Sequence, residues 1–379
     1  MIFRLLVTCV VFAAVAVSTA SADEHADCFS FSQPKCSILL STGITMRYVE
    51  VGLSNGPVVF LLHGFTDTGR AWERVLPILQ RLLPRHDIIV PDLRGHGSTS
   101  MPAGADCPAA PEACFEWGQF AADIIAFMDA RRIPRAVVVG HSMGALVAQE
   151  LGLSYPRRID GLVLVSTAAA GQEPAVGFVL NQIVEGLWQN AFVARGYSWP
   201  DGAYDLSPEV AVPGFRDFID NQWVVSAVAP SSFLDELRSA AAEVPLGTWI
   251  GALKNIYAAD NTERLRHLRV PTLALYGIQD DIFSRADEAT LIDSLRAAAS
   301  RGGSFWWKEY GELPPSDSGE QTDLGHNLPQ EAPAGVAADI ASFLEHGHPT
   351  RTLYHTDYPA DVQRVIAEPG RALIIHDEP

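Results

Sequence analysis

The chain has 379 residues, of which 48% are hydrophobic and 19% charged, a composition typical of a globular protein with a sizeable core. Its net charge of −18 disfavours nucleic acid and anionic membrane surfaces as partners, because both would repel it. The length suffices for one large α/β domain with an insertion, or for two small domains.

The first 22 residues have the pattern of a cleavable signal peptide. A positive start at Arg4 precedes an apolar run, residues 5–17, which is shorter than the roughly 20 residues that a membrane-spanning helix needs. Ala20-Ser21-Ala22 then offers the small side chains that a signal peptidase recognises. The sequence therefore predicts an exported protein, either secreted or periplasmic.

Export would place the remaining cysteines in an oxidising compartment. Four cysteines remain once the signal peptide is removed, and an even number there favours two disulfides. They lie in two local groups, Cys28 with Cys36 and Cys107 with Cys114. Bonds within each group are expected, although pairing between the groups stays open. The spacings do not match a zinc site, so no metal is predicted.

Apolar runs of strand length alternate with helical patterns along most of the chain, as a mostly parallel sheet requires. Strands are expected at 44–51, 58–62, 88–90, 135–139, 161–165, 271–276 and 304–307, and helices at 72–83, 119–131 and 145–151. The alternation within 44–51 suggests a half-buried edge strand. The core of this α/β fold is expected in two parts, residues 23–168 and 270–346.

The turn Gly140-His141-Ser142-Met143-Gly144 follows a buried strand and opens a helix. A serine between two glycines at such a turn holds its hydroxyl exposed, because a Cβ at either glycine would meet the neighbouring strand or the turn itself. The backbone N–H of Met143, at the start of the helix, then points to where a tetrahedral oxyanion would form. The pattern predicts a nucleophile at Ser142.

Between residues 169 and 269 the strand pattern stops. The segment is helical in pattern and is broken by prolines, which predicts a helical cap over the carboxyl edge of the sheet. Four tryptophans are spread through it, Trp188, Trp199, Trp223 and Trp249. Packing inside the cap is the commoner role of such side chains, while Trp188 or Trp223 could instead line an apolar pocket.

A carboxylate and a histidine complete the candidate catalytic set. Asp280 follows the strand expected at 271–276, and His326 stands on a loop before the final helix. Serine is a poor nucleophile without a base, which His326 would provide, while Asp280 would orient the imidazole and stabilise its charged form. Asp281 and, less favoured, Glu173 are the alternative acids.

Further segments resemble the α/β-hydrolase fold superfamily, in its helical-cap branch, over residues 42–346. They are His63-Gly64-Phe65, the turn at 91–98, Gly277-Ile278-Gln279-Asp280, and Gly325-His326-Asn327-Leu328 with Glu331-Ala332-Pro333. The chain order of serine, acid and histidine is the one this fold requires.

The resemblance implies a role for each of these positions. Ser142, Asp280 and His326 would form a catalytic triad, and the backbone N–H groups of Phe65 and Met143 an oxyanion hole. His63 would brace the loop that carries Phe65. A second set, Asp92, Arg94 and His96, would form a network that stabilises a tight turn.

Dehalogenases and epoxide hydrolases of this superfamily carry aspartate at the nucleophile position, where this chain has serine. We therefore expect a secreted serine hydrolase of carboxylesterase or lactonase type, which cleaves an uncharged, apolar small-molecule ester or lactone through an acyl-enzyme on Ser142. A C–C bond (diketone) hydrolase or a cofactor-free perhydrolase on the same triad is the alternative, and a ligand-binding receptor is the non-enzymatic one. With no dinucleotide fingerprint present, no cofactor is predicted.

Two regions lie outside the resemblance. Residues 28–41 are consistent with a disulfide-stapled N-terminal flap. Residues 347–379 form a C-terminal extension of unknown role, whose apolar run at 371–375 could add an edge strand, cover the cap or mediate an oligomer. The oligomeric state stays open.

Overall fold

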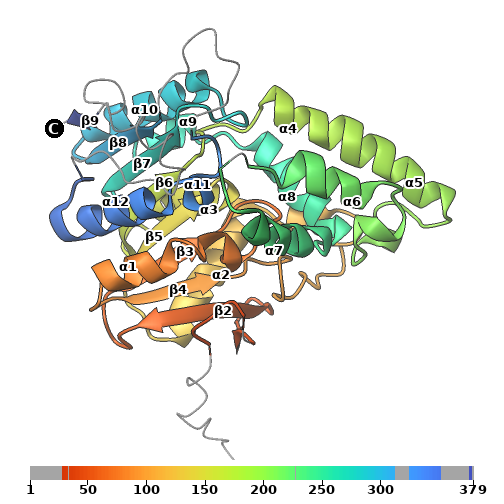
Figure 1. Cartoon of the computed structure of the whole chain (residues 1–379), viewed down its shortest axis with the longest axis horizontal. Coiled ribbons are helices and arrows are strands. Elements are labelled where there is room, and N and C mark those ends of the chain that lie inside the picture. Colours follow the sequence, from red (N-terminus) through yellow and green to blue (C-terminus); the bar gives the residue numbers. More distant parts are fainter. Residues whose placement is uncertain (1–27, 33, 227, 312–323, 351–374, 378–379) are drawn as a thin grey trace, which may run out of the picture.

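The computed structural model describes residues 28–32, 34–226, 228–311, 324–350 and 375–377. A central sheet carries helices on both faces, and a further group of helices gathers at one side of the molecule (Figure 1). The predicted signal peptide and most of the C-terminal extension lie outside the described residues. Among those described, no helix is both long and apolar enough to cross a bilayer.

The strands of the described ranges form one sheet in the order β1-β2-β4-β3-β5-β6-β7-β8-β9. They are β1 (Cys36–Leu39), β2 (Thr45–Gly52), β3 (Val58–Leu62), β4 (Asp87–Pro91), β5 (Ala136–His141), β6 (Ile159–Val165), β7 (Thr272–Gly277), β8 (Phe305–Tyr310) and β9 (Ile375–Asp377). Strands β3 to β8 run parallel to one another, whereas β2 and β9 are antiparallel to their neighbours β4 and β8. The prediction of a mostly parallel sheet is confirmed.

Helices cover both faces of the sheet because its inner strands are apolar on both sides. Every residue of β3 and β7 is buried. Alternate residues of β3 join opposite cores: Phe60 packs with α2 (Trp117–Ala130) and α3 (Met143–Ser154), and Leu61 packs with α1 (Leu76–Leu82) and α12 (Pro333–His346). A third helix, α10 (Arg285–Ala299), also packs into the first core.

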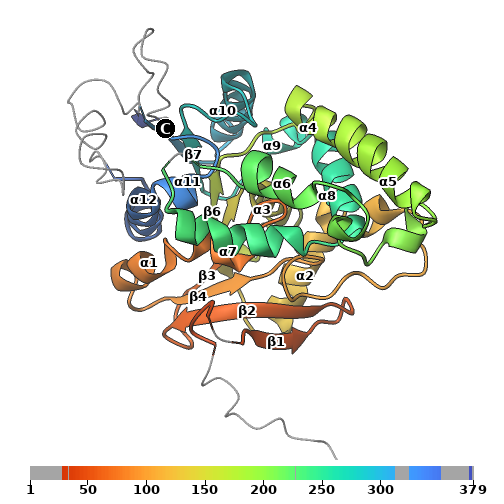
Figure 2. The ribbon, with the colours of Figure 1, turned by 45° about the vertical axis from the view of Figure 1, so that its right-hand side comes forward.

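The strand at 45–52 is not the edge of the sheet, so that part of the prediction is wrong. Strand β1 pairs antiparallel with β2, with Cys36 opposite Tyr48, and it lies beside β2 at the end of the sheet in Figure 2. Residues 28–41 therefore supply an outer strand where a flap was expected. The alternation within β2 reflects one covered face and carries no information about its place in the sheet.

At the opposite edge, Ile375–Asp377 pairs with β8, with Trp306 opposite Asp377. Of the apolar run at 371–375, only Ile375 belongs to this strand, and residues 371–374 lie outside the described residues.

The cap helices occur between β6 and β7, where the strand pattern stops in the sequence. They are α4 (Pro174–Phe178), α5 (Gln189–Ala194), α6 (Phe215–Phe218), α7 (Ser231–Ala242) and α8 (Leu246–Ala258), with wider π-helical turns at Val179–Trp188 and Ile219–Trp223 and a short α9 (Thr262–Leu265) before β7. Both views place α4, α5, α6 and α8 together, on the opposite side of the molecule from α12 (Figures 1 and 2).

Two disulfides join cysteines within the local groups, Cys28 to Cys36 and Cys107 to Cys114, with Cα–Cα distances of 5.3 and 5.6 Å. The loop closed by the second disulfide also contacts the cap, because Asn255 on α8 donates a hydrogen bond to the carbonyl of Glu112 at 2.8 Å.

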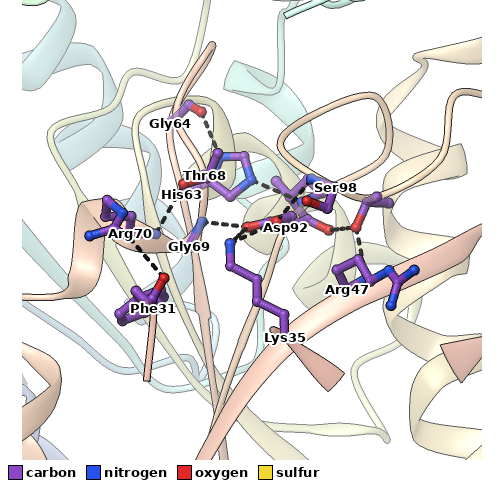
Figure 3. Close-up of polar contacts among 12 residues, drawn as sticks. Phe31, Lys35, Arg47, His63, Gly64, Thr68, Gly69, Arg70, Asp92 and Ser98 are labelled. Atoms are coloured by element: carbon purple, nitrogen blue, oxygen red, sulfur yellow. Dashed lines mark hydrogen bonds and ion pairs between the residues drawn. The ribbon is translucent and has the colours of Figure 1, made fainter. Parts of the chain in front are cut away.

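The first disulfide loop carries a lysine into the interior. The Nζ atom of Lys35 lies 2.6 and 2.8 Å from the carboxylate oxygens of Asp92, which is fully buried (Figure 3). The same carboxylate accepts hydrogen bonds from the backbone N–H groups of Gly69 and Ser98 at 2.8 and 3.3 Å. The N-terminal segment thus supplies the counter-charge for a buried acid next to the loop that follows β3.

Replacing Lys35 by alanine should lower the free energy of unfolding by about 3 kcal/mol, because the buried carboxylate of Asp92 would lose its counter-charge. Lys35→Arg keeps the charge and should lose less. Urea unfolding of both variants measures the difference. An unchanged midpoint for the alanine variant would show that this ion pair contributes nothing to stability.

Candidate active site

Ser142 stands at the sharp turn between β5 and α3. Its φ of 52° lies in the left-handed region that non-glycine residues rarely adopt. A Cβ on Gly140 would overlap the carbonyl oxygen of Gly144, and a Cβ on Gly144 would lie 2.5 Å from the carbonyl oxygen of Leu62. Only glycine fits at both positions, so the strand, the turn and the helix can pack closely enough to hold the serine in this conformation.

The structure brings together the three side chains that the sequence selected. His326 Nε2 lies 2.9 Å from Ser142 Oγ, and His326 Nδ1 lies 2.9 Å from Asp280 Oδ2. The other oxygen of Asp280 accepts hydrogen bonds from the N–H groups of Ile282 and Phe283, each at 2.9 Å. With Nδ1–H donating to the carboxylate, Nε2 is left to accept the hydroxyl proton of Ser142.

The surroundings stabilise the ionic form of the histidine–aspartate pair. Burial alone would lower the pKa of His326, but the charge and hydrogen bond of Asp280 outweigh it and raise the pKa above 6.5. Burial would raise the pKa of Asp280, but His326 and the two backbone donors lower it below 3.8. The imidazole can therefore take a proton from serine while its carboxylate partner stays ionised.

The alternative acids lie elsewhere. Asp281 is exposed at the cavity wall, and only its charge acts on His326, where it helps to raise the pKa. Glu173 precedes α4, and burial, together with a hydrogen bond to Asp287, raises its pKa to about 7. Of the three acids, Asp280 is the one within hydrogen-bond reach of His326.

Two further residues, for which the sequence predicted no role, hold the histidine loop in place. His141 Nε2 donates to the carbonyl oxygen of His326 at 2.9 Å, and burial lowers the pKa of His141 to about 3, so it stays neutral. Glu331 accepts the backbone N–H of Gly325 at 2.9 Å. Their positions within the serine and histidine motifs were the only indication in the sequence that these two residues lie near the site.

His63 braces the loop after β3, as the resemblance implied. Its Nδ1–H donates to the carbonyl oxygen of Gly64 at 2.8 Å, and its Nε2 accepts the N–H of Leu93 at 2.9 Å (Figure 3). This pair of bonds requires the neutral imidazole, and burial lowers the pKa of His63 well below 6.5.

The turn after β4 is a structural network, also as expected. Besides the contacts of Asp92, Arg94 makes two bonds of 2.8 Å to Asp123 on α2 and donates to the carbonyl oxygens of Cys114 and Gln119. His96 Nδ1 bonds the carbonyl oxygen of Arg94 at 2.9 Å.

Of the two residues expected to form the oxyanion hole, one borders the cavity and the other follows Ser142 in the chain. Phe65 lines the same cavity as Ser142 and His326. Met143 is the first residue of α3, so no carbonyl of the helix accepts its N–H. The use of these two N–H groups to hold an oxyanion stays a prediction.

A cavity of about 330 Å³ lies between the sheet and the cap, beside Ser142. Apart from Gln222, its cap wall is apolar and includes Val176, Val179, Phe218, Trp223, Leu253 and Ile256. Of the two tryptophans considered for a pocket, Trp223 lines this cavity, whereas Trp188 is buried against Trp249, with ring centroids 4.9 Å apart. The cap therefore covers the carboxyl end of β5, from which the serine projects.

One carboxyl in this cavity was not singled out in the sequence. Asp67, two residues after Phe65, lines the cavity, and burial raises its pKa to about 7, against the opposing charge of His326. Its sequence position, two residues beyond the His-Gly-Phe motif, was the only signal for it.

Comparison with known proteins identifies the family of this chain. A family model described as alpha/beta hydrolase fold matches residues 57–302. The 3-oxoadipate enol-lactonase 2 of Acinetobacter baylyi is 23% identical over 259 residues, which is 68% of this chain and 84% of that protein. Epoxide hydrolase 3 of Siraitia grosvenorii is 35% identical over 139 residues, which is 37% of this chain and only 40% of that protein.

A solved structure of a thermophilic esterase from Thermogutta terrifontis aligns with a TM-score of 0.55 and 22% identity, covering 83% of this chain and 99% of that one. At this identity the alignment shows the fold alone. The family model covers well over half of the chain, and its span includes the serine turn, the cap and the acid. This chain is thus a hydrolase that belongs to the alpha/beta hydrolase fold family, with an enol-lactonase and epoxide hydrolases among its relatives.

Proposed function

We propose that this protein is a serine hydrolase that cleaves a carboxylic ester or lactone of a small, uncharged molecule through an acyl-enzyme on Ser142. The main support is the 2.9 Å contact between His326 Nε2 and Ser142 Oγ, because the other nitrogen of the same imidazole is hydrogen-bonded to Asp280. A nucleophile, its base and the group that orients the base are then in one continuous chain of hydrogen bonds.

In the first half of the reaction, Ser142 Oγ bonds to the carbonyl carbon while its proton passes to His326 Nε2. The carbonyl π electrons move to oxygen, where the N–H groups of Phe65 and Met143 stabilise the charge by roughly 3 kcal/mol each. Collapse of this intermediate breaks the bond to the alcohol, which leaves with the proton from His326. Water then repeats the sequence on the acyl-enzyme and releases the acid and the free serine.

The cavity supports an apolar substrate of modest size. Its volume of about 330 Å³ and its aliphatic and aromatic cap wall match a small acyl or lactone ring. Asp67 and Asp281 also line it, and with the net charge of −18 they disfavour anionic substrates. One relative is named as an enol-lactonase, which supports a lactone as the bond that is cleaved.

Other activities of the family fit the site less well. Epoxide hydrolysis in this fold uses an aspartate nucleophile, whereas the position here holds Ser142 with its base in contact. A receptor without turnover would not require the three-member hydrogen-bond chain. C–C bond hydrolysis and perhydrolysis use the same triad and are separated from ester hydrolysis by substrate tests. Export remains part of the proposal, as residues 1–22 predict.

The pH dependence of kcat/KM follows from His326. A base must be neutral to accept the proton of Ser142, and the pKa of this histidine is raised above 6.5 by Asp280 against the effect of burial. We expect kcat/KM to rise with pH through a midpoint above 6.5. Because Asp67 also titrates near 7, the Asp67→Asn variant should be measured alongside, and a midpoint above 6.5 that remains in it belongs to His326.

A hydrolysis screen tests the proposed function directly. Purified protein is assayed with p-nitrophenyl esters of increasing acyl length, lactones of increasing ring size, a vinylogous diketone and an epoxide. Hydrolysis of short or medium esters or of lactones, together with labelling by a fluorophosphonate, would support the proposal. Turnover of the diketone or epoxide alone would overturn it.

A further inference from the structure

One short cap segment is hydrogen-bonded to both catalytic loops. Trp223 Nε1 donates to Thr66 Oγ1 at 2.7 Å, and both residues line the active-site cavity. Three residues later, Ser226 Oγ donates to Glu331 Oε1 at 3.1 Å. Residues 223–226 thus contact the loop after β3 on one side and the histidine loop on the other.

The first contact holds a strained part of the oxyanion loop. Thr66 directly follows Phe65 and has a φ of 61°, a conformation that a β-branched residue adopts only when its surroundings enforce it. Thr66 is 2% exposed. The ring of Phe65 packs perpendicular to that of Trp223, with centroids 6.0 Å apart. Trp223 therefore contacts both Phe65, which would supply the oxyanion N–H, and the strained residue that follows it.

The second contact reaches the histidine through two bonds. Ser226 binds one oxygen of Glu331, and the other oxygen of Glu331 accepts the N–H of Gly325 at 2.9 Å. Gly325 precedes His326, so this carboxylate links the cap to the backbone that carries the base. Glu331 is 8% exposed, so water competes little for these bonds.

The segment between the two contacts faces the substrate cavity. Val224 and Val225 line that cavity. The N–H of Val224 bonds the carbonyl of Ile219 at 3.0 Å, five residues earlier, which closes the π-helical turn Ile219–Trp223. Such wide turns are rare and occur mostly at functional sites. A substrate that packs against the two valines would press on the residues that hold both loops.

We propose that Trp223 and Ser226 are positioning residues. When the cap segment 223–226 packs over a bound substrate, these two residues place the Phe65 N–H and His326 in their catalytic positions. The inference rests on the proposed acyl-transfer function and adds to it a role for the cap in assembling the catalytic groups. A neutral hydrogen bond contributes about 1 kcal/mol, which corresponds to a roughly fivefold change in rate if it is needed in the transition state.

A double-mutant cycle between Trp223 and Thr66 tests the coupling. Trp223→Phe keeps an aromatic ring and removes the N–H, and Thr66→Val keeps the shape and removes the acceptor. Each should lower kcat about fivefold with little change in KM, and the double variant should be no worse than either single one. Thr66→Ser, which keeps the hydroxyl, should recover most of the loss. Binding of a trifluoromethyl ketone, which mimics the tetrahedral intermediate, should weaken by the same factor.

Matched controls separate this role from cap stability. Trp188 and Trp223 pack against the same ring, that of Trp249. Trp188→Phe makes the same chemical change away from the cavity and should leave kcat unaltered. Ser226→Ala should slow the fluorophosphonate reaction of Ser142, because that reaction needs His326 in place. Melting temperatures identify any variant that fails to fold.

Additive losses in the cycle, a change in KM alone, or an equal loss in Trp188→Phe would overturn the inference while leaving the proposed function intact. A wild-type protein that reacts with fluorophosphonate but hydrolyses no ester or lactone would overturn the proposed function instead. The cycle can then still be read from the inactivation rates, which report the assembly of the catalytic groups without a substrate.

Discussion

Replacing Ser142 by alanine should lower kcat for ester hydrolysis by a factor on the order of 10⁴ to 10⁶. The oxygen of Ser142 lies 2.9 Å from the base and forms the covalent bond to the acyl group in the proposed mechanism. Without it, His326 can at most activate water, and the remaining rate would come from binding and from the N–H groups at the oxyanion site.

The measurement is steady-state hydrolysis of the best ester from the screen, with fluorophosphonate labelling in parallel. Labelling should disappear in the alanine variant. Ser154→Ala, at the far end of α3, is the matched control and should keep both activity and labelling, because its hydroxyl contacts Glu150 and not the cavity. If Ser142→Ala keeps more than about a hundredth of the wild-type rate, another residue is the nucleophile.

Replacing Asp280 by asparagine should lower kcat by a factor on the order of 10³ to 10⁴. The amide cannot hold the imidazole in the tautomer that leaves Nε2 free, and it cannot stabilise the charge that His326 acquires. Because Asp280 is the main group that raises the pKa of His326 against burial, the remaining activity should have its midpoint at a lower pH.

Asp281→Asn is the matched control, since it makes the same chemical change one residue away. Asp281 is exposed and acts on His326 only through its charge, so a change of a few-fold at most is expected. A larger loss in Asp281→Asn than in Asp280→Asn would mean that Asp281 is the acid during turnover. Both variants should unfold at the wild-type temperature to within a few degrees, which thermal melting checks.

The serine turn was predictable because all of its determinants are local. A buried strand, two glycines and a helix lie within about twenty residues, and together they allow only a sharp turn at the serine. The close approach of Gly144 to the backbone of Leu62 shows why glycine is needed there. The inner strands were predictable for a similar reason, since a fully apolar run of five residues fits a covered parallel strand. The role of His63 followed from its motif, and the structure places both of its nitrogens in hydrogen bonds.

Other features depend on which segments meet. The sequence of residues 28–41 did not predict a strand, so the strand at 44–51 was expected at the edge of the sheet. Whether a short segment pairs as a strand depends on its neighbours in the sheet and not on its own sequence alone. Nothing in the sequence indicated that Lys35 has a structural role, because its ion-pair partner Asp92 lies 57 residues away in the chain. Aromatic residues in the cap look alike in the sequence, and only packing separated the buried Trp188 from Trp223 at the cavity.

The sequence by itself determined the fold class and selected Ser142 and His326 as the candidate nucleophile and base, because backbone constraints and motif order act over short stretches. Only the tertiary structure shows that Asp280, and not its neighbour Asp281, is hydrogen-bonded to His326. Neighbouring residues in a loop point in different directions, and their reach to His326, 46 residues from Asp280, depends on how β7 and the histidine loop lie side by side. The same holds for the contact of Trp223 with Thr66, which joins residues 157 positions apart. Such contacts arise when separate segments pack, and no local pattern encodes them.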